Sequence, residues 1–273
     1  MAATMAIARA AASSGSAPAD GWTLAAIAIL AAAITVMLHE GLGHGGACVL
    51  SGGHNLVIST VHENCTVSNH WISAAGTVVN LAVGLICWGW ASRIPRAPRF
   101  RYFVWLLAVF NWLTGAGYFL FSGVGNLGDW AEVLAGHEPA WLWHAGMAAG
   151  GAALYVLFVW LLARALRPFL PTGIERVACA RRLMLVPYFT FGILAVIAGS
   201  LNPVGAVLIA ESAAAASFGG ASGLCWGWQF TRSGYFAKGA APPLPLIRSR
   251  GWIFAGALTA AAFIFLIGPG FRP

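Results

Sequence analysis

The stretch GWTLAAIAILAAAITVMLHEGLGHGG, residues 21–46, decides how the chain folds. Residues 21–38 contain no charged side chain, and roughly 20 apolar residues are enough to cross a bilayer as a helix. The run ends in His39, Glu40 and His44. Ionisable groups are costly in hydrocarbon and usually serve a function there. The stretch therefore predicts a membrane-spanning helix that carries a functional site near its end.

The composition of the whole chain agrees with a membrane location. Of the 273 residues, 59% are hydrophobic and only 8% are charged, whereas about a quarter of the residues are charged in soluble domains. The 15 Lys and Arg residues cluster beside apolar segments, as in the cytoplasmic loops of membrane proteins. We expect an all-α polytopic membrane protein in contact with the lipid bilayer, and no nucleic-acid partner.

The apolar segments predict six or seven transmembrane helices in a single domain, residues 21–273, after a flexible N-terminal tail, residues 1–20. The predicted spans are 21–44, 71–90, 102–121, 141–166, 183–210, 213–228 and 251–267. Residues 213–228 are rich in Gly and Ala and leave two alternatives open, a thin sixth span or a re-entrant segment.

The loops between these spans differ in charge. Those after the second, fourth and sixth segments are rich in Arg, so the positive-inside rule predicts that they face the cytoplasm. Residues 45–70 and 122–140 contain no Lys or Arg and are expected to face outward. This pattern favours seven crossings. It predicts an integral membrane protein, in a bacterial inner membrane, whose N-terminus is cytoplasmic.

The first outward loop has its own character. It is rich in Gly, and a β-type run at residues 56–61 lies between Gly52-Gly53 and Asn64, which predicts a small β-containing extracytoplasmic loop. Cys48 and Cys65 both belong to this loop. Disulfides form in oxidising compartments, and an outward loop would face one. We therefore hypothesise a disulfide bridge between these two cysteines.

The predicted topology brings several candidate metal ligands together. His39 and His44 lie at the outward end of the first span, and Asp129 follows the third span, which also ends outward. Imidazole nitrogens and carboxylate oxygens are typical zinc ligands. Glu211 ends the fifth span on the same side and is an alternative third ligand.

The spacing of the two histidines leaves three arrangements open. His39 and His44 are five residues apart, which puts them about 140° apart around a regular α-helix. A π-type turn would bring them within roughly 50° of each other. Alternatively, Gly41 and Gly43 could unwind the helix end and let His44 fold back. In the third arrangement Glu40 and His44 form the facing pair, with Glu40 as a ligand and no free base.

A polar residue in the second span completes the pattern. Asn80 lies one turn after Gly76, and an amide at that depth needs a partner. Together with the His-Glu motif and a carboxylate after the third span, these residues resemble the site-2 protease family of intramembrane zinc metalloproteases over roughly residues 30–130. The family helix carries His-Glu-x-x-His, and here one further residue separates Glu40 from His44.

The resemblance implies a metalloprotease-like core at about residues 21–135 and additional helices at 141–268. It implies a zinc ion held by His39, His44 and Asp129, with Glu40 as the catalytic base. Asn80 would contact the substrate or the ligands. The substrate class would be peptide bonds of membrane-associated proteins or peptides.

Two further residues are candidates for contacts around the metal or the substrate. Asn126 shortly precedes Asp129, and His144 opens the fourth span on the same side of the membrane.

A non-proteolytic role is the alternative. The chain would then be an integral membrane accessory subunit or scaffold, with or without a bound metal, packed against partner subunits of a larger complex. Its 13 Trp residues favour this somewhat, although many of them lie near span ends, where aromatic residues are common. A water-accessible groove that reaches the histidines favours the enzyme, and a sealed motif favours the scaffold.

Overall fold

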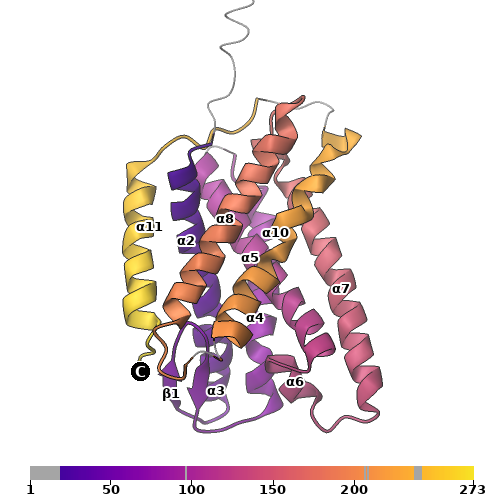
Figure 1. Ribbon diagram of the computed structural model, residues 1–273, viewed down its shortest axis with the longest axis vertical. Coiled ribbons are helices and arrows are strands. Elements are labelled where there is room, and N and C mark those ends of the chain that lie inside the picture. The colour runs from indigo at the N-terminus through magenta and orange to yellow at the C-terminus, as the bar shows by residue number, and fades with distance from the viewer. Residues whose placement is uncertain (1–18, 96, 206, 208, 237–241) are drawn as a thin grey trace, which may run out of the picture.

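The computed structural model describes residues 19–95, 97–205, 207, 209–236 and 242–273; the side chain of Glu211 is also not described. Nearly all of the predicted tail, residues 1–20, thus lies outside the described residues. Figure 1 shows long helices packed side by side, with β1, α3 and α6 gathered at the lower end of the bundle.

Six helices among the described residues are long and apolar enough to cross a membrane: Gly21–Leu50, His70–Ala91, Pro98–Gly125, Ala140–Phe169, Glu175–Gly199 and Arg250–Ile267. The predicted all-α polytopic fold is therefore confirmed. The elements in chain order are α2 (Gly21–Met37), η1 (Leu38–Gly45), α3 (Gly46–Leu50), β1 (Asn55–Ile58), β2 (Glu63–Cys65), α4 (His70–Ala91), α5 (Pro98–Gly125), α6 (Asp129–Leu134), α7 (Ala140–Ala165), η2 (Arg167–Phe169), α8 (Glu175–Gly199), η3 (Ile209–Gly219), η4 (Gly220–Ser222), α10 (Gly223–Trp226), η5 (Gly227–Arg232), η6 (Gly234–Phe236), α11 (Arg250–Ala262) and η7 (Phe263–Ile267).

The segment from η3 to η5 is an interrupted helix. Its backbone passes from a π-helix through 3-10 turns and a short α-helix, and Figure 1 shows this orange segment running obliquely along the bundle. Small residues allow this close packing. A Cβ on Gly223 would lie 2.5 Å from Val159 Cγ2, so only glycine fits there. The segment is longer and less regular than the span predicted at residues 213–228.

The fifth span differs from its predicted bounds of 183–210. Helix α8 begins at Glu175, before the apolar run, and ends at Gly199. Asn202 lies in the turn that follows, where its Oδ1 accepts a hydrogen bond from the Val204 N–H and its Nδ2 donates to the Gly268 carbonyl. Side-chain bonds of this kind satisfy a turn and compete with helix continuation.

A proline inside α8 is accommodated by a neighbouring helix. Pro187 has no N–H, so the carbonyl of Leu183, four residues earlier, loses its helical partner. The buried Tyr102 hydroxyl of α5 donates to that carbonyl at 2.6 Å. The Leu183 carbonyl, which could find no hydrogen-bond donor in lipid, is thereby hydrogen-bonded within the bundle.

The loop after α3 is fastened to the bundle at two points. β1 and β2 form an antiparallel pair, and Ile58 of β1 also pairs with Phe271 near the C-terminus. A disulfide joins Cys48 of α3 to Cys65 of β2. The small β-containing loop is therefore tied to the same helical run that carries His39 and His44.

Candidate metal centre

The two motif histidines lie on a π-helix. Residues Leu38–Gly45 form η1, and the Gly46 N–H at its end donates to the carbonyl of Gly41, five residues earlier. The ring centroids of His39 and His44 are 4.7 Å apart. Of the three arrangements left open by the sequence, the structure has the π-type turn.

Glycine contacts explain why the π-turn fits against α4. A Cβ on Gly43 would lie 2.5 Å from the Cα of Gly76. A Cβ on Gly76 would in turn lie 2.6 Å from His39 Cε1 and from His44 Nε2. Because both positions lack a side chain, η1 and α4 approach closely and the two imidazoles occupy the space beside Gly76.

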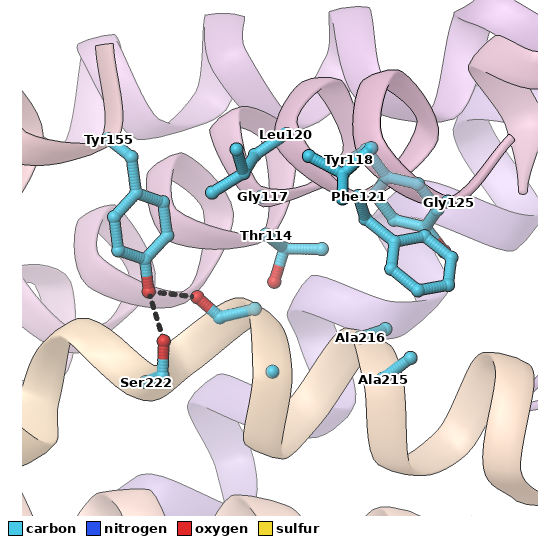
Figure 2. A pocket seen from close by; sticks show the side chains of 13 residues that line it. Thr114, Gly117, Tyr118, Leu120, Phe121, Gly125, Tyr155, Ala215, Ala216 and Ser222 are labelled. Atoms are coloured by element: carbon cyan, nitrogen blue, oxygen red, sulfur yellow. Dashed lines mark hydrogen bonds between the residues drawn. The ribbon is translucent and has the colours of Figure 1, made fainter. Parts of the chain in front are cut away.

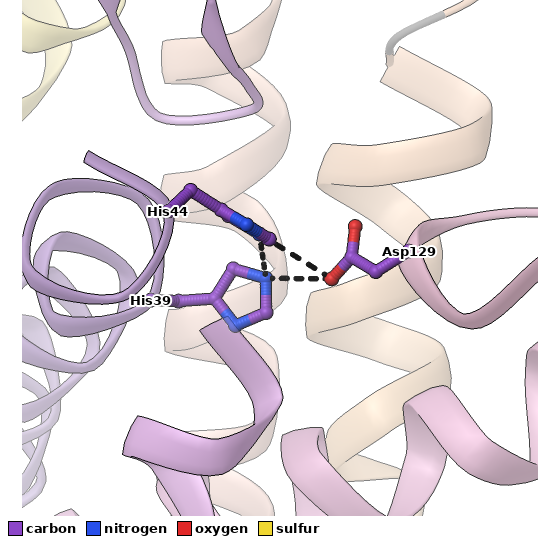
Figure 3. Close-up of side chains that lie close together, drawn as sticks. All are labelled: His39, His44 and Asp129. Carbon is purple, nitrogen blue, oxygen red and sulfur yellow. Dashed lines mark hydrogen bonds and ion pairs between the residues drawn. The ribbon is translucent and has the colours of Figure 1, made fainter. Parts of the chain in front are cut away.

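Asp129 completes a compact group with the two histidines (Figure 3). Its Oδ2 lies 3.1 Å from His39 Nε2 and 3.4 Å from His44 Nε2, and the two Nε2 atoms are 3.1 Å apart. Both histidines are buried, with 4% and 8% of their surface exposed. These three side chains form a group that could hold a metal ion.

The chain before α6 turns so that Asp129 faces the histidines. Gly128 has a φ of 77°, a conformation that glycine adopts without strain, and Asp129 is the first residue of α6. Burial by itself would raise the pKa of the Asp129 carboxyl, but the hydrogen bonds with His39 and His44 outweigh it and hold that pKa below its usual range. Asp129 is thus ionised at neutral pH, as a metal ligand must be.

Hydrogen bonds on the far side of each ring orient the histidines. His44 Nδ1 donates to the carbonyl of Ile72 at 2.7 Å, and His39 Nδ1 lies 2.6 Å from Asn80 Oδ1. Ile72 is itself fixed at the start of α4, where its N–H donates to the side chain of Asn69. Partners of this kind are typical of metal-binding histidines, because they aim the second ring nitrogen at the metal.

Two residues that the sequence analysis did not single out help to hold this group in place. The ring of Tyr118 in α5 stacks on His39, with centroids 4.8 Å apart and planes inclined by 13°. Glu132 of α6 accepts a hydrogen bond of 2.6 Å from Ser73 of α4. These contacts confine His39 from one side and fasten α6, and hence Asp129, to α4.

Glu40 is buried beside the group and faces a cavity. Only 6% of its surface is exposed. A cavity of about 430 Å³, here called the polar cavity, reaches Glu40, His44 and Asp129. Its other lining residues come from the hairpin region, α4, α5, α6 and η3: Val61, His62, Glu63, Asn64, Cys65, Val67, Ser68, Ile72, Ser73, Tyr118, Gly128, Glu132 and Ser212.

The remaining predicted residues occupy other places. Asn80 touches His39 directly. Asn126 is exposed at the C-terminus of α5, where it adopts a left-handed conformation with φ of 52°. His144 lies half-buried in α7, and neither residue is among the described residues that line the polar cavity. Glu211 belongs to η3, but its side chain lies outside the described part of the structure.

Two imidazole nitrogens and one carboxylate oxygen form a donor set that suits transition metals, and zinc in particular. No protein-family model, curated protein or solved structure matches this chain. The donor atoms themselves must therefore indicate what the centre binds.

The spacing of the donor atoms fits a tetrahedral ion. Zinc bonds to nitrogen and oxygen are about 2.0–2.2 Å long, which places neighbouring ligand atoms of a tetrahedral site roughly 3.3 Å apart. The three separations among the donors are 3.1, 3.1 and 3.4 Å. Three protein ligands also leave a fourth position, as in catalytic zinc sites.

An apolar cavity also borders Tyr118 (Figure 2). It measures about 590 Å³, and residues of α5, α7, η3 and η4 line it. Tyr155 holds its floor in place, since its hydroxyl donates to the Gly220 carbonyl at 2.6 Å and accepts from the Gly223 N–H at 2.7 Å. Tyr118 lines both this cavity and the polar cavity.

Proposed function

We propose that the protein is a membrane-embedded zinc metallopeptidase, similar to site-2 proteases, that hydrolyses peptide bonds of membrane-associated polypeptides. One observation carries this proposal: His39, His44 and Asp129 meet with metal-ligand spacing, while the buried carboxylate of Glu40 faces the same polar cavity. Three ligands, a neighbouring carboxylate and an adjacent cavity are the parts that metal-assisted hydrolysis requires.

The roles of the residues follow from their positions. His39, His44 and Asp129 would hold the ion, which, when bound, lowers the pKa of a coordinated water to about 7 and polarises the peptide carbonyl. Glu40 accepts a proton from the attacking water and delivers it to the leaving amine nitrogen. Tyr118 and Asn80 keep the His39 ring in place.

The polar cavity supports an enzyme over a scaffold. A buried structural site has no need of solvent, whereas hydrolysis consumes a water molecule at each turnover. The cavity of about 430 Å³ beside Glu40 and His44 is large enough to hold water and a short stretch of extended peptide. A regular helix keeps its carbonyls in its own hydrogen bonds, so the substrate must be unwound where it is cut.

The distribution of arginines supports an outward-facing centre. The lower end of the bundle in Figure 1 holds β1, α3 and α6, and so the candidate metal centre. The loops that join α4 to α5 and α7 to α8 lie at the other end and are the ones rich in Arg. By the positive-inside rule, we infer that the Arg-rich end is cytoplasmic, in a bacterial inner membrane.

A reconstituted cleavage assay tests the proposal. The full chain would be placed in liposomes with a fluorogenic, unstructured peptide tethered to the bilayer. We expect cleavage that a chelator such as 1,10-phenanthroline abolishes and that added Zn²⁺ restores. Metal binding without cleavage of any peptide in a varied panel would contradict the enzyme and leave an accessory subunit or scaffold.

A further inference from the structure

A chain of buried polar side chains runs from His39 into the bundle, away from the polar cavity. His39 Nδ1 lies 2.6 Å from Asn80 Oδ1, and Asn80 Nδ2 donates to Asn111 Oδ1 at 2.7 Å. Asn111 Nδ2 donates to Thr35 Oγ1 at 2.9 Å and to the Leu107 carbonyl at 2.8 Å. The side chains of Asn80 and Asn111 are fully buried, and Thr35 is 1% exposed.

One backbone carbonyl sets the direction of every bond in this chain. The Leu107 oxygen can only accept, so the atom of the Asn111 amide that faces it must be the NH₂ group. The oxygen of Asn111 then faces Asn80 and requires the Asn80 NH₂ group there. The Asn80 oxygen is left for His39, whose Nδ1 must carry the hydrogen.

The direction of the chain matters because a neutral imidazole has one N–H and one lone pair. A hydrogen held on Nδ1 of His39 makes Nε2, the atom that points at Asp129, the nitrogen that a metal ion would bind. We propose that Asn111 is a positioning residue. Through Asn80, it fixes a hydrogen on Nδ1 of His39, so that Nε2 is the ring nitrogen left to bind a metal ion.

The two histidines differ in what holds them. His44 Nδ1 donates directly to the Ile72 carbonyl, so a backbone group alone sets its tautomer. His39 depends on two amide side chains that a mutation can remove. A change at position 111 should therefore alter His39 and leave His44 as it was.

The tautomer can be read directly from nitrogen NMR of the metal-free protein. The full chain, labelled with ¹⁵N-histidine in detergent, would be studied at about pH 9, where imidazoles in water are neutral. The signals of His39 are those missing from a His39→Ala sample. In the wild type, we expect Nδ1 of His39 to be protonated.

Two variants of similar burial separate positioning from simple packing. Asn111→Leu keeps the branching and the number of heavy atoms of the side chain but removes the amide, so we expect a mixture of His39 tautomers and an unchanged His44. Thr35→Val also removes a buried hydrogen bond of Asn111, but the Leu107 carbonyl still sets the direction. We expect Thr35→Val to keep the wild-type tautomer.

A cobalt titration adds a second readout, which rests on the proposed metal function. Loss of an outer partner of a metal ligand typically weakens binding about 10–100-fold, and we expect this for Asn111→Leu but not for Thr35→Val.

A fixed wild-type tautomer in Asn111→Leu would overturn the proposal. If that variant fails to fold, a bare Nδ1 on His39 in the wild type would overturn it equally. A wild type that binds no cobalt contradicts the metal function, and the nitrogen spectrum still decides the role of Asn111.

Discussion

Replacing Glu40 by Gln is expected to abolish peptide cleavage while the metal stays bound. Gln has nearly the same shape, but its amide cannot take a proton from water. Removal of a general base costs typically about 10²–10⁴-fold in rate. The metal should remain because Glu40 does not belong to the ligand group His39, His44 and Asp129. The measurement is the cleavage rate in liposomes together with the metal content of the same sample.

Glu132→Gln is the matched control for this experiment. Glu132 lines the same polar cavity and lies outside the ligand group, and the amide oxygen of Gln can still accept the hydrogen bond from Ser73 that fastens α6 to α4. The control should retain most of the wild-type rate. Equal rates for Glu40→Gln and the wild type would remove Glu40 from the role of base.

Gly76→Ala is expected to empty the metal centre without unfolding the protein. The added methyl group would lie 2.6 Å from His39 Cε1 and from His44 Nε2. Helix α4 cannot retreat freely, because it is packed against α5, where Trp112 lies against Gly84 and donates to the Leu81 carbonyl. The imidazoles must therefore move, and we expect metal affinity to fall on the order of 100-fold, measured by titration with Co²⁺ or Zn²⁺.

Gly89→Ala in the same helix serves as its control. The nearest atom to a Cβ there is the Arg93 guanidinium nitrogen at 3.6 Å, an ordinary contact. Alanine is favoured over glycine in a helix by up to about 1 kcal/mol, so this variant should fold and bind metal normally. A metal affinity in Gly76→Ala equal to that of the wild type would show that α4 does not confine the two histidines.

The membrane fold could be predicted from hydropathy because lipid leaves few choices for the backbone. Long apolar runs must be helical, since each backbone group needs a partner within the segment. Helix ends were less predictable. Helix α8 extends through a polar stretch at residues 175–182 that hydropathy alone reads as a loop, and it ends where Asn202 bonds across to Gly268.

The sequence predicted which residues form the candidate metal centre, but it left the relative orientation of His39 and His44 open. Topology brought Asp129 to the same end of the bundle as His39 and His44. The choice among the three histidine arrangements depended on the contact of Gly43 with Gly76. That contact joins separate helices, and no local pattern contains it.

Some contact residues were missed for identifiable reasons. Asn111 carries the same signal as Asn80, an amide inside an apolar span, and that argument could have found it. Tyr118 offers no such signal, because tyrosines are common near span ends. Asn126 was chosen because it shortly precedes Asp129, and His144 because it lies on the same side of the membrane. Either criterion places a residue at one end of the bundle without bringing its side chain to the metal centre.

Elemental analysis of the purified protein beside its His44→Ala variant tests the central claim most directly. A matched His137→Ala variant, outside the ligand group, controls for the loss of a histidine. The proposed centre predicts about one zinc ion per chain in the wild type and in His137→Ala, and its loss in His44→Ala. Absence of metal from all three proteins, or equal metal in all three, would contradict a centre built on His39, His44 and Asp129.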